Sequence, residues 1–93
     1  MNGPINPKFS VKQDGTTLNI YHPNKGEGLP RHQHSFSHLT ICHAGSIVVR
    51  KEGIESIRTK DSQPVNLVAN EWHEIEALED NTIFVNVFAE DKY

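Results

Sequence analysis

Three histidines lie close together in this chain, at residues 32, 34 and 38. Successive side chains of an extended strand point to opposite faces, so these even spacings would place all three imidazoles on one side. Neutral imidazole nitrogens held close together suit a divalent transition metal. We therefore expect His32, His34 and His38 to be metal ligands, the alternative being a solvated histidine-rich loop. An apolar segment at 39–42 follows at once and favours a position at the mouth of a core.

A fourth histidine, His73, begins a segment in which apolar and acidic residues alternate. Ile75 and Ala77 would share its face, while Glu74 and Glu76 would face the solvent. The apolar face predicts that His73 points into the fold. A lone buried histidine is more often a hydrogen-bonded core residue than a ligand, but the first cluster makes His73 a candidate for the same ion.

The elements that must position these side chains are short β-strands, because no segment combines helix caps with a 3.6-residue apolar period. Strands are expected at 16–21, 29–33, 37–43, 46–51, 54–59, 65–68, 72–78 and 82–88. Leu18 and Ile20 would share one face of the first, and a bulge is possible in 54–59. Short strands separated by turns every 8–12 residues or so predict an all-β sandwich or barrel. We expect an N-terminal arm at 1–15, held by Phe9 and Val11, and a barrel domain at 16–93, ending in a polar tail.

The composition bounds the function. Nine basic and twelve acidic residues give a net charge of −3, which argues against a nucleic-acid partner. No apolar run approaches the ~18 residues of a membrane span, and no signal peptide is evident. The single cysteine excludes an internal disulfide, so we expect a cytoplasmic protein. The apolar share of 35% is low, so a metal or oligomerisation could add stability.

The first cluster resembles a known motif. The spacing of Gly26, His32, His34, His38 and Gly45 is similar to the first cupin motif, in which the third ligand is usually a glutamate and here is His38.

The second cupin motif is kept only in part. His73 stands at its histidine position, Asn70 at its turn and Ala77 where an asparagine is frequent. Asn70 can serve the turn, since asparagine tolerates a left-handed backbone. The likeness covers about residues 16–88. It implies a cupin-type jelly-roll β-barrel with a metal in its mouth, and a homodimer; it does not imply a reaction, because this fold hosts many.

One divalent transition metal ion, of Fe, Ni, Mn, Zn, Co or Cu, is the expected cofactor. Four neutral imidazoles would leave its charge at +2, which favours an anionic ligand or a bound hydroxide. Two octahedral positions would stay open. We therefore expect a mononuclear metal-dependent dioxygenase or related enzyme acting on a small anionic or enolisable molecule. The alternatives are metal-dependent ligand binding or sensing without turnover, and a metal that only stabilises the barrel. No catalytic residue is identified.

Three residues are expected around the ligands. Thr40 and Cys42 share the face of His38 and would line the cavity floor, and Phe36 would wall its mouth. Cys42 is more simply a buried thiol than a fifth ligand.

Four further residues stay open. Arg31 could meet an anionic ligand or be a surface arginine, and His22 could reach the site or be an exposed loop residue. His43 would face away from the ligands, and Trp72 would serve packing or a dimer contact.

Overall fold

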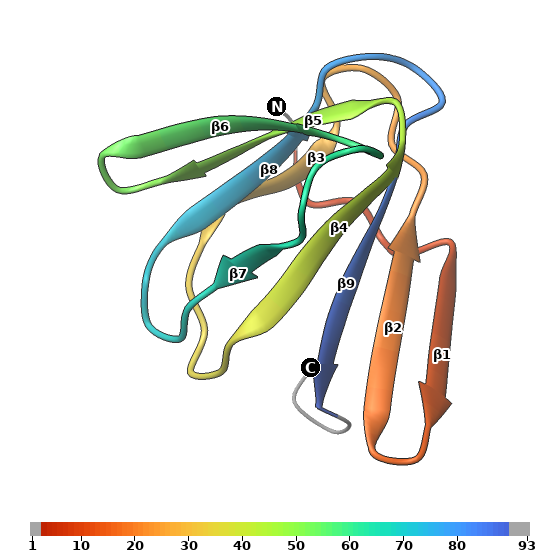
Figure 1. The fold of residues 1–93 in the computed structure, drawn as a ribbon, viewed down its shortest axis with the longest axis vertical. Helices are drawn as coiled ribbons and strands as arrows, with labels where there is room; N and C mark the ends of the chain where they lie inside the picture. The colour runs from red at the N-terminus through yellow and green to blue at the C-terminus, as the bar shows by residue number, and fades with distance from the viewer. Residues whose placement is uncertain (1–2, 90–93) are drawn as a thin grey trace.

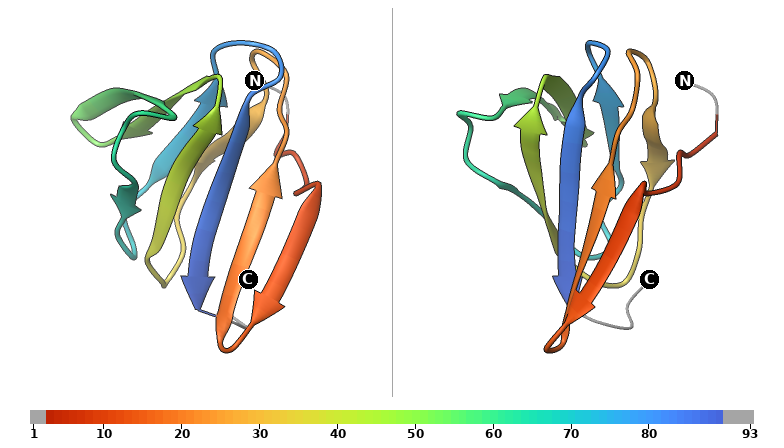
Figure 2. Two further views of the ribbon diagram at one scale, coloured as in Figure 1. Left: turned by 45° about the vertical axis from the view of Figure 1, so that its right-hand side comes forward. Right: turned by 90° about the vertical axis from the view of Figure 1, so that its right-hand side faces the viewer.

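The computed structural model describes residues 3–89, which form nine strands and no helix (Figure 1). The strands are β1 (Phe9–Gln13), β2 (Thr16–Tyr21), β3 (Gly28–His32), β4 (His38–Ala44), β5 (Ser46–Lys51), β6 (Ile54–Thr59), β7 (Val65–Leu67), β8 (His73–Ala77) and β9 (Ile83–Ala89). They make two antiparallel sheets, a five-stranded one in the order β1-β2-β9-β4-β7 and a four-stranded one in the order β3-β8-β5-β6. The sheets face each other as a β-sandwich (Figure 2). The expected all-β class is confirmed.

The eight expected strands all occur, and each of their ends shifts by one residue or less. The expected arm differs, because Phe9–Gln13 forms β1 and pairs in register with β2. Phe9 and Val11 do not anchor it in the core: their side chains are 54% and 46% exposed. The bulge considered possible in 54–59 is absent, since β5 and β6 pair without interruption. Register shifts lie instead between Leu29 and His32 and between Cys42 and Ala44.

Two turns carry backbone requirements. Asn70 has a φ of 67°, as expected for the turn before His73. The β4–β5 turn requires glycine at position 45 for two reasons. Gly45 has a φ of 73°, and a Cβ there would collide with Thr82.

The inner faces of the two sheets differ in polarity. The four-stranded sheet contributes apolar side chains, among them Ile47, Val49 and Ile75, all essentially buried. The five-stranded sheet adds Tyr21, Phe84 and Leu67 but also a set of buried polar residues: Thr17, Asn19, His38, Thr40 and Asn86. Leu18 and Ile20 do share a face, as expected, but it is the outer one, because the inward positions of β2 are the buried Thr17, Asn19 and Tyr21.

Candidate metal centre

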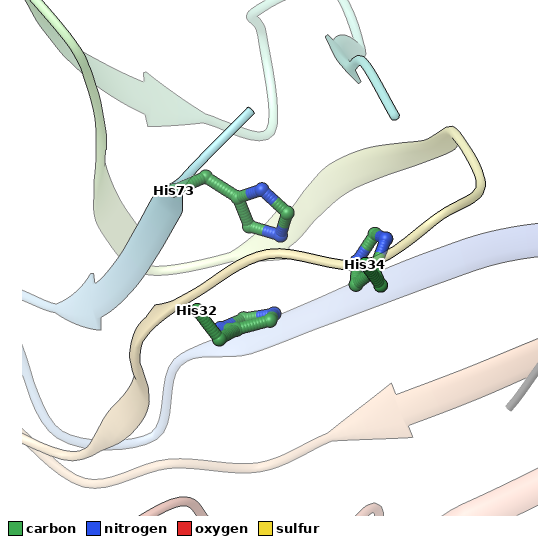
Figure 3. A group of neighbouring side chains, drawn as sticks. All are labelled: His32, His34 and His73. Carbon is green, nitrogen blue, oxygen red and sulfur yellow. The ribbon is translucent and has the colours of Figure 1, made fainter. Parts of the chain in front are cut away.

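Three of the four candidate histidines meet at one place between the sheets. Ring nitrogens of His32, His34 and His73 lie within 4.8 Å of one another (Figure 3). Two nitrogens bound to one ion at about 2.1 Å are at most about 4.2 Å apart, so small side-chain adjustments would suffice to share an ion. The two chain regions that supply them are joined because β3 pairs with β8, which sets His32 opposite His73.

The first cluster does not lie on one strand, so the expectation that strand alternation places the three imidazoles on one side is wrong. His32 ends β3, His34 lies in the following loop and His38 opens β4. Because β3 and β4 belong to different sheets, the chain must turn between them. The residues converge through this turn rather than through strand alternation.

Backbone carbonyls orient the three rings. The Nδ1 atoms of His32 and His34 each lie 2.7 Å from a carbonyl oxygen, of Pro30 and Phe36 respectively. His73 Nδ1 lies 3.2 Å from the Glu71 carbonyl. A carbonyl only accepts, so each Nδ1–H donates, and the lone pair is on Nε2. His73 Nε2 is buried and has no hydrogen-bond partner among residues 3–89. These are the properties of a nitrogen suited to a metal.

His38 lies beside this group and is not part of it. Its ring centre is 5.0 Å from that of His34 and 5.3 Å from that of His73. Its Nδ1 lies 3.3 Å from Thr40 Oγ1, and the Thr40 hydroxyl donates to Asn86 Oδ1 at 2.7 Å. Because the Thr40 hydroxyl donates its hydrogen to Asn86, it can only accept a hydrogen bond from His38 Nδ1–H. The lone pair of His38 is therefore on Nε2.

Asn86 is a site residue that the sequence interpretation missed. It is fully buried and supports Thr40, which supports His38. The sequence did contain a sign of this buried position. Asn86 is the only polar residue in the segment 83–88, and it lies on the same face of the strand as the large apolar residues Phe84 and Phe88.

Burial and mutual repulsion disfavour the charged forms of His34, His38 and His73. Burial, reinforced by repulsion from neighbouring histidines, lowers the pKa of both His38 and His73 to about 4. Burial also lowers the pKa of His34. The rings of His34, His38 and His73 are therefore ready to bind a cation without first losing protons.

The residues expected around the ligands occupy distinct places. Phe36 stacks on His34, with ring centres 4.2 Å apart. The Cys42 thiol points to the β4–β5 turn, where Sγ lies 3.5 Å from the carbonyl oxygen of Ala44, and burial raises its pKa. A thiol held there in its protonated form is a packing group.

Neither His22 nor His43 reaches the cluster. His22 is exposed beside Phe9, and His43 is exposed on the outer face of β4, as expected.

A cavity of about 310 Å³ opens beside His32. Its walls also include Pro4, Tyr21, Leu29, Pro30 and Arg31. The Arg31 guanidinium lies over the Trp72 ring, 4.3 Å from its centre, which fixes a positive charge at the cavity wall. The cavity is apolar except for the Tyr21, Arg31 and His32 side chains.

No protein-family model matches the sequence, and no curated protein matches it. Solved structures do match. KdgF from a Halomonas species superposes with a TM-score of 0.76 at 16% identity, over 85% of this chain and 73% of that one. A cupin-2 domain protein from Shewanella frigidimarina gives 0.73 at 7% identity, over 92% and 84%. A double-stranded β-helix protein from Klebsiella pneumoniae gives 0.75 at 18% identity, over 99% and 82%.

The fold is a cupin-type jelly roll. At these identities the likeness establishes architecture and leaves activity open. The histidine cluster adds a possible metal site to that fold. Within residues 3–89 no helix is long and apolar enough to cross a membrane.

Proposed function

We propose that this protein is a small metal-binding cupin that presents one divalent transition metal ion to a small anionic molecule. The convergence of His32, His34 and His73 is the observation that carries the proposal. We assign His38 as the fourth ligand, because its Nε2 holds a lone pair and its ring contacts those of His34 and His73. The single cysteine fits a cytoplasmic location.

The cavity beside His32 supports a small ligand with an apolar body and an anionic head. Leu29, Pro4 and Pro30 offer apolar contacts, and Arg31 offers a positive charge. An ion held only by neutral imidazoles keeps its charge of +2, so it too attracts an anion. The ligand would bind with its charged group toward the ion and Arg31.

A dioxygenase-type reaction is our first choice of chemistry. When bound, the metal would supply open positions for substrate and O2, and such a reaction consumes only these two. This chain's own residues would hold the ligand and exclude water. Among residues 3–89, the group that could hold a metal consists of His32, His34 and His73 and includes no carboxylate. Since proton transfer normally needs a positioned acid or base, this composition favours, as the second candidate, metal-dependent binding without turnover.

The ligand set is tested by metal analysis of protein without a histidine tag. We expect one ion per chain, and at least about a tenfold loss of affinity in His34→Ala or His73→Ala. His43→Ala is the matched control and should bind as the parent does. Absence of bound transition metal after incubation with Fe²⁺, Ni²⁺, Mn²⁺ and Zn²⁺ would overturn the proposal.

The reaction is tested by O2 uptake with a diketone, a catechol and a thiol as probes. Uptake that disappears in His73→Ala supports the dioxygenase. Recovery of an unchanged probe by mass spectrometry, with retained binding, supports the second candidate.

A further inference from the structure

The cavity beside His32 lies between β2 and β3, the latter an edge strand of the four-stranded sheet. Tyr21 walls it from β2, and Leu29 and Pro30 wall it from β3. The segment before β1 bridges the same two strands through backbone hydrogen bonds and adds Pro4 to the wall (Figure 2). Its volume of about 310 Å³ equals that of about ten liquid waters at about 30 Å³ each, so the cavity suits a small molecule.

Tyr21 is the buried polar group of this cavity. Its side chain is 3% exposed, and its ring stacks on that of Phe84, with centres 4.7 Å apart and planes 13° apart. Stacking on a buried ring fixes the direction of the phenol. Burial raises the pKa of Tyr21, and a hydrogen bond with Asn19 lowers it by less, so the hydroxyl keeps its proton at neutral pH.

Asn19 determines which hydrogen bond the Tyr21 hydroxyl can still make. The Ser10 hydroxyl donates to Asn19 Oδ1 at 2.7 Å, so the amide nitrogen of Asn19 is the group left for Tyr21. An amide nitrogen only donates, so the phenolic oxygen accepts, and its own proton is left to donate. No acceptor for that proton is found among residues 3–89. Tyr21 is therefore an oriented hydrogen-bond donor at the cavity wall.

The strand register shows which way this donor points. Pairing through β9 sets Tyr21 level with Cys42 of β4. The same pairing sets Asn19 level with Thr40, two residues nearer to His38. Since the Tyr21 hydroxyl meets Asn19, it points along the sheet toward the end that carries the histidine cluster.

We propose that Tyr21 determines ligand specificity by selecting small carboxylic acids that carry a carbonyl oxygen at the far end of an apolar body. Arg31, held over the Trp72 ring, takes the carboxylate together with the histidine end of the cavity, and Tyr21 donates to the carbonyl oxygen. An acid without that oxygen would displace water from the buried donor and leave it unpaired, which is the physical basis of the selectivity. This inference rests on the proposed function and adds the class of ligand to it.

The test is calorimetric binding to the untagged protein loaded with Zn²⁺, which supports no redox turnover. The probes are 4-acetylbenzoate and 4-isopropenylbenzoate, which share a shape and differ by a carbonyl oxygen in place of a methylene group. The parent should bind the ketone about tenfold more tightly than the alkene. Tyr21→Phe should bind the two equally, with its affinity for the alkene unchanged. A merely structural role of Tyr21 would instead move both affinities together.

Thr17→Val is the matched control, because it removes a buried hydroxyl from the same strand at a position outside the cavity. It should keep the preference for the ketone. Equal binding of the two probes by the parent, binding of neither at about 1 mM, or a preference that survives in Tyr21→Phe would overturn the inference.

Zinc content measured on the same samples separates this inference from the proposed function. One bound Zn²⁺ per chain without a preference for the ketone would overturn this inference alone. A preference that depends on Tyr21, in a protein that binds no zinc or other transition metal, would uphold it and overturn only the metal site.

Discussion

The two sheets of this molecule distribute polarity in opposite ways. Apart from the histidines His32 and His73 at one end, the four-stranded sheet is apolar inside, with Ile47, Val49 and Ile75, and it is ionic outside. On its outer side Arg50 lies 3.0 Å from Glu74 and 2.8 Å from Glu76. The five-stranded sheet is partly polar inside and apolar outside. The first sheet therefore behaves as an ordinary solvated layer, whereas the second must place polar groups in the interior and apolar groups at the surface.

The four-stranded sheet contributes mainly to stability, and the polar interior of the five-stranded sheet supports the candidate metal centre. Burying apolar area is the main favourable contribution to folding, and the four-stranded sheet supplies a continuous apolar layer for it. The buried polar side chains of the five-stranded sheet cost free energy unless they are hydrogen-bonded. They are retained where they support the histidine cluster, as Thr40 and Asn86 do for His38.

The largest effect is expected in the apolar layer. Ile75→Ala removes a fully buried side chain from β8 and should lower the free energy of unfolding by about 4 kcal/mol. Denaturant unfolding of the metal-free protein measures it. Ile57→Ala, at an exposed position on β6, is the control and should change stability by less than about 0.5 kcal/mol. Equal losses in the two variants would contradict the assigned layer.

Acid should destabilise the metal-free protein through its buried histidines, His38 on the five-stranded sheet and His73 on the four-stranded sheet. His38 and His73 have a pKa of about 4 in the folded state against 6.5 unfolded. Between these values the unfolded chain binds more protons, so stability falls as pH drops from 6.5 to 4. Each histidine can contribute up to about 3 kcal/mol.

Unfolding curves at several pH values measure this slope. His38→Gln should flatten it, while His43→Gln, at an exposed position, should not. A parent protein equally stable at pH 4.5 and pH 7 would argue against buried neutral histidines.

Thr40→Val should be destabilising by about 2 kcal/mol, because it leaves His38 Nδ1–H and Asn86 Oδ1 buried without their partner. The same change should weaken metal binding about tenfold by releasing the His38 ring. Thermal unfolding and metal titration report the two effects separately. Thr40→Ser, which keeps the hydroxyl, should restore metal affinity if the hydrogen bond is responsible.

A threonine-to-valine substitution on β2, Thr17→Val, should raise the free energy of unfolding, whereas Thr40→Val on β4 should lower it. Thr17 is buried, and its Oγ1 has no hydrogen-bond partner among residues 3–89. Thr17→Val replaces that hydroxyl with a methyl group of similar size, so we expect a gain of about 1 kcal/mol. A loss of stability comparable to that of Thr40→Val would show that the polar interior is supported at both strands.

The sequence by itself determined every strand except β1, and it determined the alternation along them. Turn residues bounded each segment, and the positions of Glu74, Ile75, Glu76 and Ala77 correctly predicted that His73 points inward. The number and spacing of the histidines predicted a metal site without any structure.

Only the tertiary structure decided which face of the five-stranded sheet is inside. Alternation fixes the relation between neighbouring residues, but the inward face depends on the strands paired alongside and on the opposing sheet. In β2 this placed Thr17 and Asn19 inside and Leu18 outside. It also decided how the histidines meet, because the pairing of β3 with β8 and the turn at 33–37 bring together residues that no spacing rule could place.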